Sequence, residues 1–171
     1  MKLDAKGWLI GVEHHASPNF NERPPETKID LLVIHAISLP PDEFSANDVI
    51  DFFMNHYPPM KDIKVSAHFF IKRDGTIVQF VSVFDRAWHA GVSEFEGRAN
   101  CNDYSIGVEM EGCDTISFTA GQYQSLIELT RFLQKQFQAL RITSHAKIAL
   151  PQGRKTDPGP MFDWDRYFKG V

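Results

Sequence analysis

The chain has 171 residues and a mass of 19.5 kDa, which is the length of one domain, since single domains typically contain ~100–200 residues. Hydrophobic residues make up 43% and charged residues 23%, a balance that excludes a disordered acidic tail and a collagen-like rod. Lys and Arg number 18 against 22 Asp and Glu, giving a formal net charge of −4. Because nucleic-acid binders usually show a basic excess, we expect no nucleic-acid partner.

The start of the chain and its two cysteines bear on location. The longest apolar stretch near the start, residues 7–12, is too short for a signal-peptide core of ~7–15 residues, and no stretch approaches the length of a membrane span. We therefore expect a cytoplasmic protein with no membrane partner. Cys101 and Cys113 form no CxxC pair, so we expect two reduced, buried thiols rather than a redox or four-cysteine zinc site.

The first 57 residues predict one strand and one helix after an irregular start. Residues 1–30 are expected to be irregular because prolines interrupt them. The continuous apolar run 31–37 predicts a strand buried on both faces. Apolar residues recur at helical spacing over 47–57, with Ser45 or Asn47 as the N-cap.

A hairpin and a further strand follow. Residues 65–71 and 76–81 predict two strands joined by a turn at Asp74-Gly75. The alternation of apolar and polar residues over 105–111 predicts a strand with two distinct faces.

The second half is expected to contain the longest helix. Thr119 and Gln122 match a capping box, and an apolar stripe predicts a helix over 120–138. Residues 142–145 predict a last short strand that enters a long loop, and 163–168 a final short helix. Strands interleaved with helices predict a single α/β domain over the whole chain, with a mixed central sheet flanked by helices.

Two histidines and one aspartate are candidates for a metal site. His35 lies inside an apolar strand and His145 at the end of another, where an unpaired polar group costs ~1–3 kcal/mol, so each imidazole needs a partner or a metal. Asp157 lies in a loop rich in Pro and Gly, and Pro158 restricts it to an extended conformation. Imidazole and carboxylate are zinc ligands, and catalytic zinc sites keep a fourth position open. The spacing alone leaves hydrogen-bonded core histidines and a rigid surface loop as alternatives.

Five segments in order resemble the AmpD-type zinc amidases of the amidase type 2 family, whose fold is shared with peptidoglycan-recognition proteins. The segments are LLVIHAISLPP (31–41), VSAHFFIKRDGTIVQFV (65–81), RAWHAGVS (86–93), CNDYSIGVEMEG (101–112) and RKTDPGPMFDW (154–164). The resemblance implies one zinc amidase domain over 1–171. It also implies an activity, hydrolysis of the bond between 1,6-anhydro-N-acetylmuramic acid and L-Ala in muropeptides during cell-wall recycling. We expect a monomer.

The resemblance also implies roles for single residues. His35, His145 and Asp157 match the zinc ligands, Glu109 matches the catalytic acid/base, and Lys155 matches the lysine that stabilises the transition state. A zinc ion polarises the substrate carbonyl and activates a water molecule, and a poorly reactive amide requires both effects.

The remaining matches concern the substrate. Trp88 and His89 fall on the stretch that lines the substrate groove, and Lys64 replaces an Arg that meets a carboxylate of the stem peptide in the family. Lysine keeps the charge but lacks the bidentate fork of Arg. Ala36 replaces an Asn that commonly follows the first ligand histidine.

Several alternatives stay open at this point. Glu111 lies on the same face of its strand as Glu109 and is the alternative acid/base, whereas His68 is interpreted as structural. A peptidoglycan-binding module without catalysis is the second function, although such proteins usually lose a metal ligand and this chain has all three. A third is a periplasmic or secreted amidase that acts on intact wall.

Overall fold

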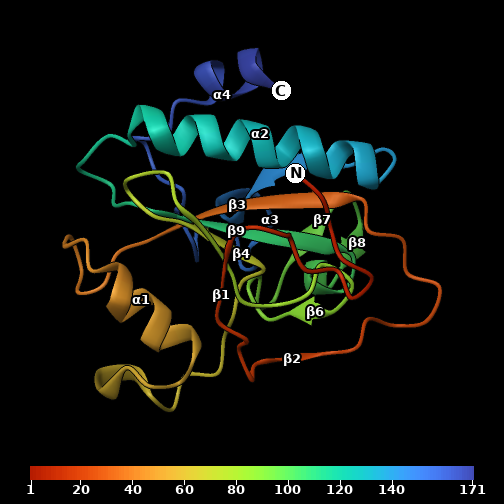
Figure 1. Cartoon of the computed structure of the whole chain (residues 1–171), viewed down its shortest axis with the longest axis horizontal. Coiled ribbons are helices and arrows are strands. Elements are labelled where there is room, and N and C mark those ends of the chain that lie inside the picture. Colours follow the sequence, from red (N-terminus) through yellow and green to blue (C-terminus); the bar gives the residue numbers. More distant parts are fainter.

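The computed structural model describes all residues from 1 to 171, and a mixed six-stranded sheet lies at its centre (Figure 1). Its strands are β1 (Glu13–His14), β3 (Leu31–Ile37), β4 (Phe69–Ile71), β5 (Ile77–Gln79), β9 (Ser105–Glu111) and β10 (Arg141–Ser144). Their spatial order is β1-β5-β4-β9-β3-β10. Only β4 and β5 pair antiparallel, and all other neighbours are parallel. The expectation of an α/β fold with a mixed central sheet is confirmed.

Helices and two small sheets surround this centre. The helices are α1 (Ala46–Phe53), α2 (Ala120–Gln136), α3 (His145–Ile148) and α4 (Trp164–Gly170), with short 3₁₀ turns η1 (Pro58–Met60) and η2 (Cys101–Asp103). Strand β2 (Phe20–Asn21) pairs with β6 (Arg86–Ala87), and β7 (Glu94–Phe95) pairs with β8 (Arg98–Ala99). None of the helices combines the length and the apolar character needed to cross a membrane.

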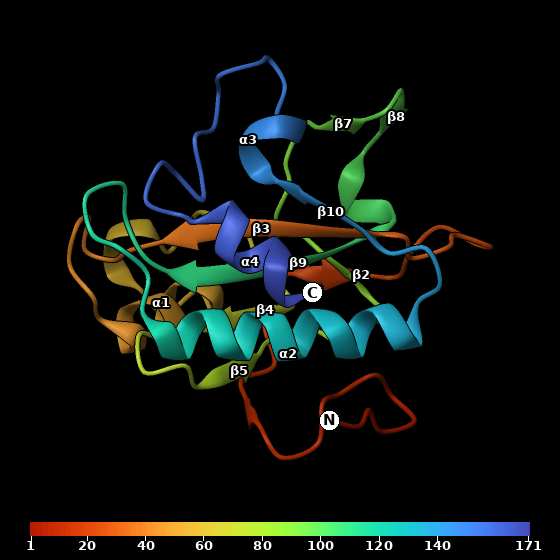
Figure 2. The same cartoon turned by 90° about the horizontal axis from the view of Figure 1, so that it is seen from above.

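One face of the sheet is apolar and is covered by α2, with α4 beside it (Figures 1 and 2). The predicted capping box is present, because Thr119 accepts from the Gln122 amide while the Gln122 side chain accepts from the Thr119 amide. The α2 side chains that enter the core are Tyr123, Leu126, Leu129 and Leu133. Burying a leucine of this kind stabilises the fold by ~1.5–3 kcal/mol. This face therefore anchors the sheet.

The opposite face is divided. Helix α1 covers the β4–β5 end, where Phe53 packs with Phe70 and Phe80. At the β3–β10 end, residues of the 90–104 segment and α3 pack on Leu31 and Val33. Between these two coverings the sheet carries polar side chains, and the candidate site lies there.

The structure corrects several predicted boundaries. Helix α1 ends at Phe53 rather than at Tyr57, because Asn55 has a φ of 61° and Pro58 begins a 3₁₀ turn. The hairpin strands are shorter than predicted, although the Gly75 turn with its φ of 90° is present. Residues 1–30 are not wholly irregular, as predicted from their prolines, because they contain the two-residue strands β1 and β2. Both free cysteines are buried, as expected.

Candidate metal centre

Parallel pairing aligns three functional side chains across neighbouring strands. His35 of β3 pairs with Glu109 of β9, and Ile34 pairs with Ser144 of β10. Continuing that register by one residue brings His145 beside His35. His145 is the first residue of α3 rather than the end of a strand, which corrects the prediction. The carboxyl ends of parallel strands are a common place for ligand sites in α/β folds.

Asp157 joins the two histidines from the loop that follows α3. Its Oδ2 lies 3.2 Å from Nδ1 of His35 and 3.1 Å from Nδ1 of His145. Its carbonyl accepts from the amide of Ala146, which ties the loop to α3. One ligand atom from each of the three residues lies within 4.8 Å of the others. The structure thus brings together the three predicted metal ligands.

The chemistry of this cluster fits a divalent metal. Nδ1 of His35 is buried, faces Asp157 and has no hydrogen-bond partner, a costly arrangement without a ligand. Burial lowers the pKa of His35 to about 4, so the imidazole is neutral at neutral pH, the form that binds metal. An aspartate side chain is ordinarily ionised at neutral pH, so Asp157 can serve as the oxygen ligand.

Glu109 lies next to the cluster but outside it. Its Oε1 is 3.9 Å from Nδ1 of His35, and its Oε2 is buried without a hydrogen-bond partner. Burial raises the pKa of Glu109 well above its usual value, and the Asp157 charge raises it further, while Lys155 opposes the rise. A carboxyl group with a raised pKa can exchange protons near neutral pH, as a general acid/base requires.

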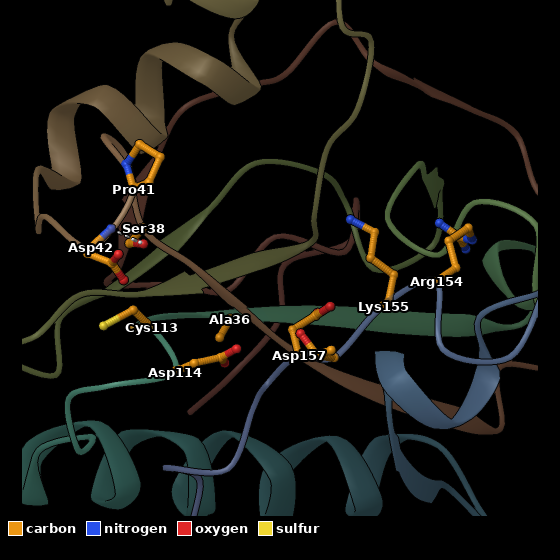
Figure 3. Close-up of a pocket in the computed structure, with 11 residues that line it drawn as sticks. Ala36, Ser38, Pro41, Asp42, Cys113, Asp114, Arg154, Lys155 and Asp157 are labelled. Carbon is orange, nitrogen blue, oxygen red and sulfur yellow. Dashed lines mark hydrogen bonds between the residues drawn. The ribbon is translucent and has the colours of Figure 1, made fainter.

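A cleft of about 290 Å³ opens onto these groups. Its polar lining includes Glu109, His145, Asp157 and Lys155, and its apolar wall includes Phe52 of α1. A second hollow of about 350 Å³ adjoins it (Figure 3). In Figure 3, Lys155, Arg154 and Asp157 rise from one loop, and the opposite wall comes from the segments after β3 and β9. The exposed Lys155 therefore brings a positive charge to the mouth of both hollows.

Glu111 has a different environment from Glu109. Its Oε2 accepts from the backbone amide of Arg73 at 2.8 Å, and it lines neither hollow beside the metal cluster. Burial raises the pKa of Glu111 too, although the Arg73 amide and charge oppose the rise. A raised pKa alone therefore does not distinguish the two carboxyl groups, whereas their positions do.

The three residues assigned to the substrate lie around one depression of about 250 Å³ next to the cluster. Lys64 is exposed and donates to the Lys61 carbonyl. Trp88 is half-buried, with its indole nitrogen donating to Asn21. His89 is 8% exposed, and both of its ring nitrogens lie within hydrogen-bond distance of protein atoms.

His68 is fully buried beneath the site. Its Nδ1 accepts from the Gly107 amide at 3.0 Å, so its Nε2 carries the proton and can donate to the Asp85 carbonyl. Burial, followed by the nearby Arg23 charge, lowers the pKa of His68 to about 3. The structural interpretation of His68 fits these contacts.

Two buried polar residues near the cluster lie in the quoted segment 101–112, but the sequence analysis assigned neither of them a role. Asn102 accepts from two consecutive backbone amides, those of His89 and Ala90, and Ser105 lies 3.1 Å from Nε2 of His89. Arg154 donates to the Ala90 and Val92 carbonyls. Only the fold brings these residues to the site, because their contacts join distant segments.

Comparison with known proteins identifies relatives over nearly the whole chain. The family model described as N-acetylmuramoyl-L-alanine amidase matches residues 25–160. The 1,6-anhydro-N-acetylmuramyl-L-alanine amidase AmpD of Salmonella typhimurium is 46% identical, with 96% of this chain and 92% of the relative covered. The Escherichia coli protein of the same name is 45% identical, with 95% and 93% covered.

Solved structures agree with these relatives. A crystal structure of a selenomethionine AmpD derivative superimposes with a TM-score of 0.93 at 44% identity and covers 100% of this chain and 99% of that one. The Escherichia coli amidase AmiD was solved with anhydro-N-acetylmuramic acid-L-Ala-D-γ-Glu-L-Lys. It superimposes with a TM-score of 0.64 at 26% identity, with 89% of this chain and 65% of that chain covered. The expected fold is confirmed.

Proposed function

The chain belongs to the N-acetylmuramoyl-L-alanine amidase family, and from this we propose that it hydrolyses the amide between 1,6-anhydro-N-acetylmuramic acid and L-Ala in muropeptides, with zinc as its cofactor. The observation that carries the proposal is the His35, His145 and Asp157 cluster, with the unpartnered Nδ1 of His35 beside Glu109. The relatives named for this substrate cover more than nine-tenths of the chain, which supports the same substrate class.

His35, His145 and Asp157 would hold the ion as two nitrogen ligands and one oxygen ligand. When bound, zinc supplies a Lewis acid for the amide carbonyl and lowers the pKa of water toward ~7. Three protein ligands leave a position free for water or substrate, which is the arrangement of catalytic rather than structural zinc sites.

Glu109 would move the protons. As a carboxylate it accepts a proton from the attacking water, and as an acid it delivers that proton to the departing nitrogen of L-Ala. Its position beside His35 and its raised pKa support both halves of this role. The contacts of Glu111 with the Arg73 amide support a structural role for that second carboxyl group.

Lys155 would face the negative charge that develops on the carbonyl oxygen. A positioned donor at such an oxyanion contributes roughly 2.7–4 kcal/mol to catalysis. Lys155 lies two residues before Asp157 in the same loop and lines the cleft that Glu109 also lines. One short loop would therefore supply both a metal ligand and the oxyanion charge.

Trp88, His89 and Lys64 would line the path of the substrate. Trp88 presents an aromatic surface for the sugar or lactyl group, and the exposed Lys64 ammonium is available for a stem-peptide carboxylate. Ala36, at the position where the family commonly carries Asn, lines both hollows. The proposal includes action as a monomer in the cytoplasm, on released wall fragments.

One assay tests the proposal. Zinc-loaded protein is incubated with 1,6-anhydro-N-acetylmuramyl tripeptide and with the matching muropeptide that lacks the anhydro bond, each with and without a chelator. Mass spectrometry follows the released tripeptide. We expect chelator-sensitive release from the anhydro substrate. Equal release from both substrates would indicate a general wall amidase. No release from either with zinc bound would contradict the proposal and favour a binding module.

A further inference from the structure

Two consecutive residues, His89 and Ala90, contact the Nε2 atoms of His35 and His145, the ring nitrogens that face away from Asp157. Nε2 of His35 lies 2.9 Å from Nδ1 of His89, and Nε2 of His145 lies 3.2 Å from the carbonyl oxygen of Ala90. The histidines come from segments more than a hundred residues apart, yet both rest on the short segment 88–91.

These contacts set the protonation of each ring. A carbonyl oxygen only accepts, so Nε2 of His145 carries the proton and its Nδ1 presents a lone pair toward Asp157. For His35 the proposed metal ligation decides the direction: its unpartnered Nδ1 faces Asp157 and, as a ligand, carries no proton, so its Nε2 is protonated and donates to Nδ1 of His89. His89 in turn donates from Nε2 to the hydroxyl of Ser105 at 3.1 Å. Both histidines therefore present Nδ1 to the metal position.

The segment 88–91 is itself held rigidly. Oδ1 of Asn102 accepts from the amides of His89 and Ala90, at 3.1 and 2.8 Å. A Cβ on Gly107 would lie 2.5 Å from Cγ of His89, which shows how closely the imidazole approaches the β9 backbone. Asn102 is 6% exposed and His89 8% exposed, so water has little access to these bonds. Neither residue can shift without breaking several contacts.

We propose that the segment 88–91 is a positioning element for the zinc ligands, in which His89 orients His35, the Ala90 carbonyl orients His145, and Asn102 holds both. The inference rests on the proposed function, because it takes these two histidines as zinc ligands. Hydrogen bonds to the rear nitrogen of a ligand histidine fix its tautomer and ring direction, and their loss typically costs 10–100-fold in metal affinity. His89 is thus a positioning residue for the metal as well as a wall of the substrate depression.

Zinc affinity measured without substrate tests this inference. His89→Phe keeps a ring but removes the acceptor for His35, whereas the Oδ1 of Asn in His89→Asn can take the place of Nδ1. We expect zinc Kd, measured by competition with a chelator at fixed pH, to rise about 10–100-fold in His89→Phe and to stay within about threefold of wild type in His89→Asn. A His89→Phe variant that binds zinc as tightly as wild type would overturn the inference.

A second pair of variants perturbs the segment without touching a ring. Asn102→Ala removes the acceptor for both amides and is expected to weaken zinc binding about tenfold, whereas Asn102→Asp keeps a carboxylate oxygen there and restores most of the affinity. Cobalt(II) spectra of the two variants report whether ligand geometry changes. If His89→Phe does not fold, an unchanged zinc Kd in Asn102→Ala overturns the inference.

A control variant separates general destabilisation from this effect. Thr130 of α2 and Tyr167 of α4 pair hydroxyl to hydroxyl at 2.7 Å, on the other side of the sheet. Thr130→Val should lower the melting temperature and leave zinc Kd unchanged. Wild type that binds no stoichiometric zinc would contradict the proposed function. Tight zinc binding by wild type and by all His89 and Asn102 variants would contradict only the positioning role.

Discussion

The two faces of the central sheet are built from the same strands but differ in chemistry. On β3, Leu32 and Ile34 point into the apolar cluster beneath α2, whereas Leu31, Val33 and His35 point to the other side. On β9, the residues that join the same apolar cluster are Ile106, Val108 and Met110. The residues that alternate with them are Ser105, Gly107, Glu109 and Glu111. One alternation therefore supplies both a core and a site.

The difference lies in how completely the polar atoms are satisfied. The face under α2 carries apolar side chains, whereas the opposite face holds buried atoms without hydrogen-bond partners on His35 and Glu109, beside the candidate metal position. Unpaired buried polar atoms cost stability, so they are expected at positions that serve a ligand or a reaction. The apolar face under α2 therefore supplies stability that offsets the unpaired polar atoms of the site face. Substitutions on the two faces should separate folding from chemistry.

Loss of a metal ligand should have the largest effect. Asp157→Ala removes the only carboxylate of the cluster and leaves two histidines without their common partner. We expect loss of bound zinc after dialysis, measured by elemental analysis, and loss of muropeptide hydrolysis to background. Asp165→Ala, an exposed acidic residue on α4, is the matched control and should keep both. Retention of one zinc per chain in Asp157→Ala would contradict the ligand assignment.

Glu109→Gln should separate zinc binding from turnover. The amide has nearly the same shape but cannot accept or deliver the proton, so kcat should fall about 10²–10⁴-fold. Bound zinc should remain at one per chain, because Glu109 lies outside the cluster. Steady-state kinetics together with zinc analysis check both expectations. Near-normal turnover in this variant would remove Glu109 from the mechanism.

A substitution on the α2 face should show the opposite pattern. Leu129 is fully buried in the cluster beneath α2, and Leu129→Ala should lower the free energy of unfolding by about 2–5 kcal/mol. Zinc affinity and kcat of the folded fraction should not change. Denaturant unfolding and zinc titration on the same sample measure the two effects. A comparable loss of zinc affinity would show that the faces are energetically coupled.

Glu111→Gln should have the smallest effect on activity and a distinct effect on stability. Because burial raises the Glu111 pKa above 4.5, ionisation costs the folded state free energy. The Glu111 contribution to stability is therefore largest at low pH and is lost as pH rises through the raised pKa. The free energy of unfolding of wild type, measured in chelator, should fall relative to Glu111→Gln as pH rises. Turnover should stay within about twofold, since the carboxyl group proposed to transfer protons is Glu109.

Much of the fold follows from local pattern. The apolar run 31–37, the alternation 105–111 and the capped stripe of α2 all lie where predicted, because burial on a face and capping act over a few residues. The prediction of α1 was too long because apolar spacing continued past the left-handed Asn55. Strands β1 and β2, with two residues each, carry too little pattern to be found without their pairing partners.

Less of the candidate site could be predicted from local sequence pattern. The distance in sequence between His35 and His145 gives no hint that β3 and β10 are neighbours, since that depends on the order of strands in the sheet. The family resemblance, rather than spacing, proposed the ligand set. Asn102 lies only 12 and 13 residues after the two amides that it accepts from, but these bonds depend on how the intervening chain folds back, which the local pattern does not predict.

X-ray absorption at the zinc edge tests the central claim most directly. Protein loaded with one equivalent of zinc should show a first shell of nitrogen and oxygen only, at about 2.0–2.2 Å, with the imidazole scattering of two histidines. That result would place the ion on His35, His145 and Asp157. A sulfur shell at about 2.3 Å would place it on a cysteine instead, such as Cys113 in the adjoining hollow, and would contradict the account.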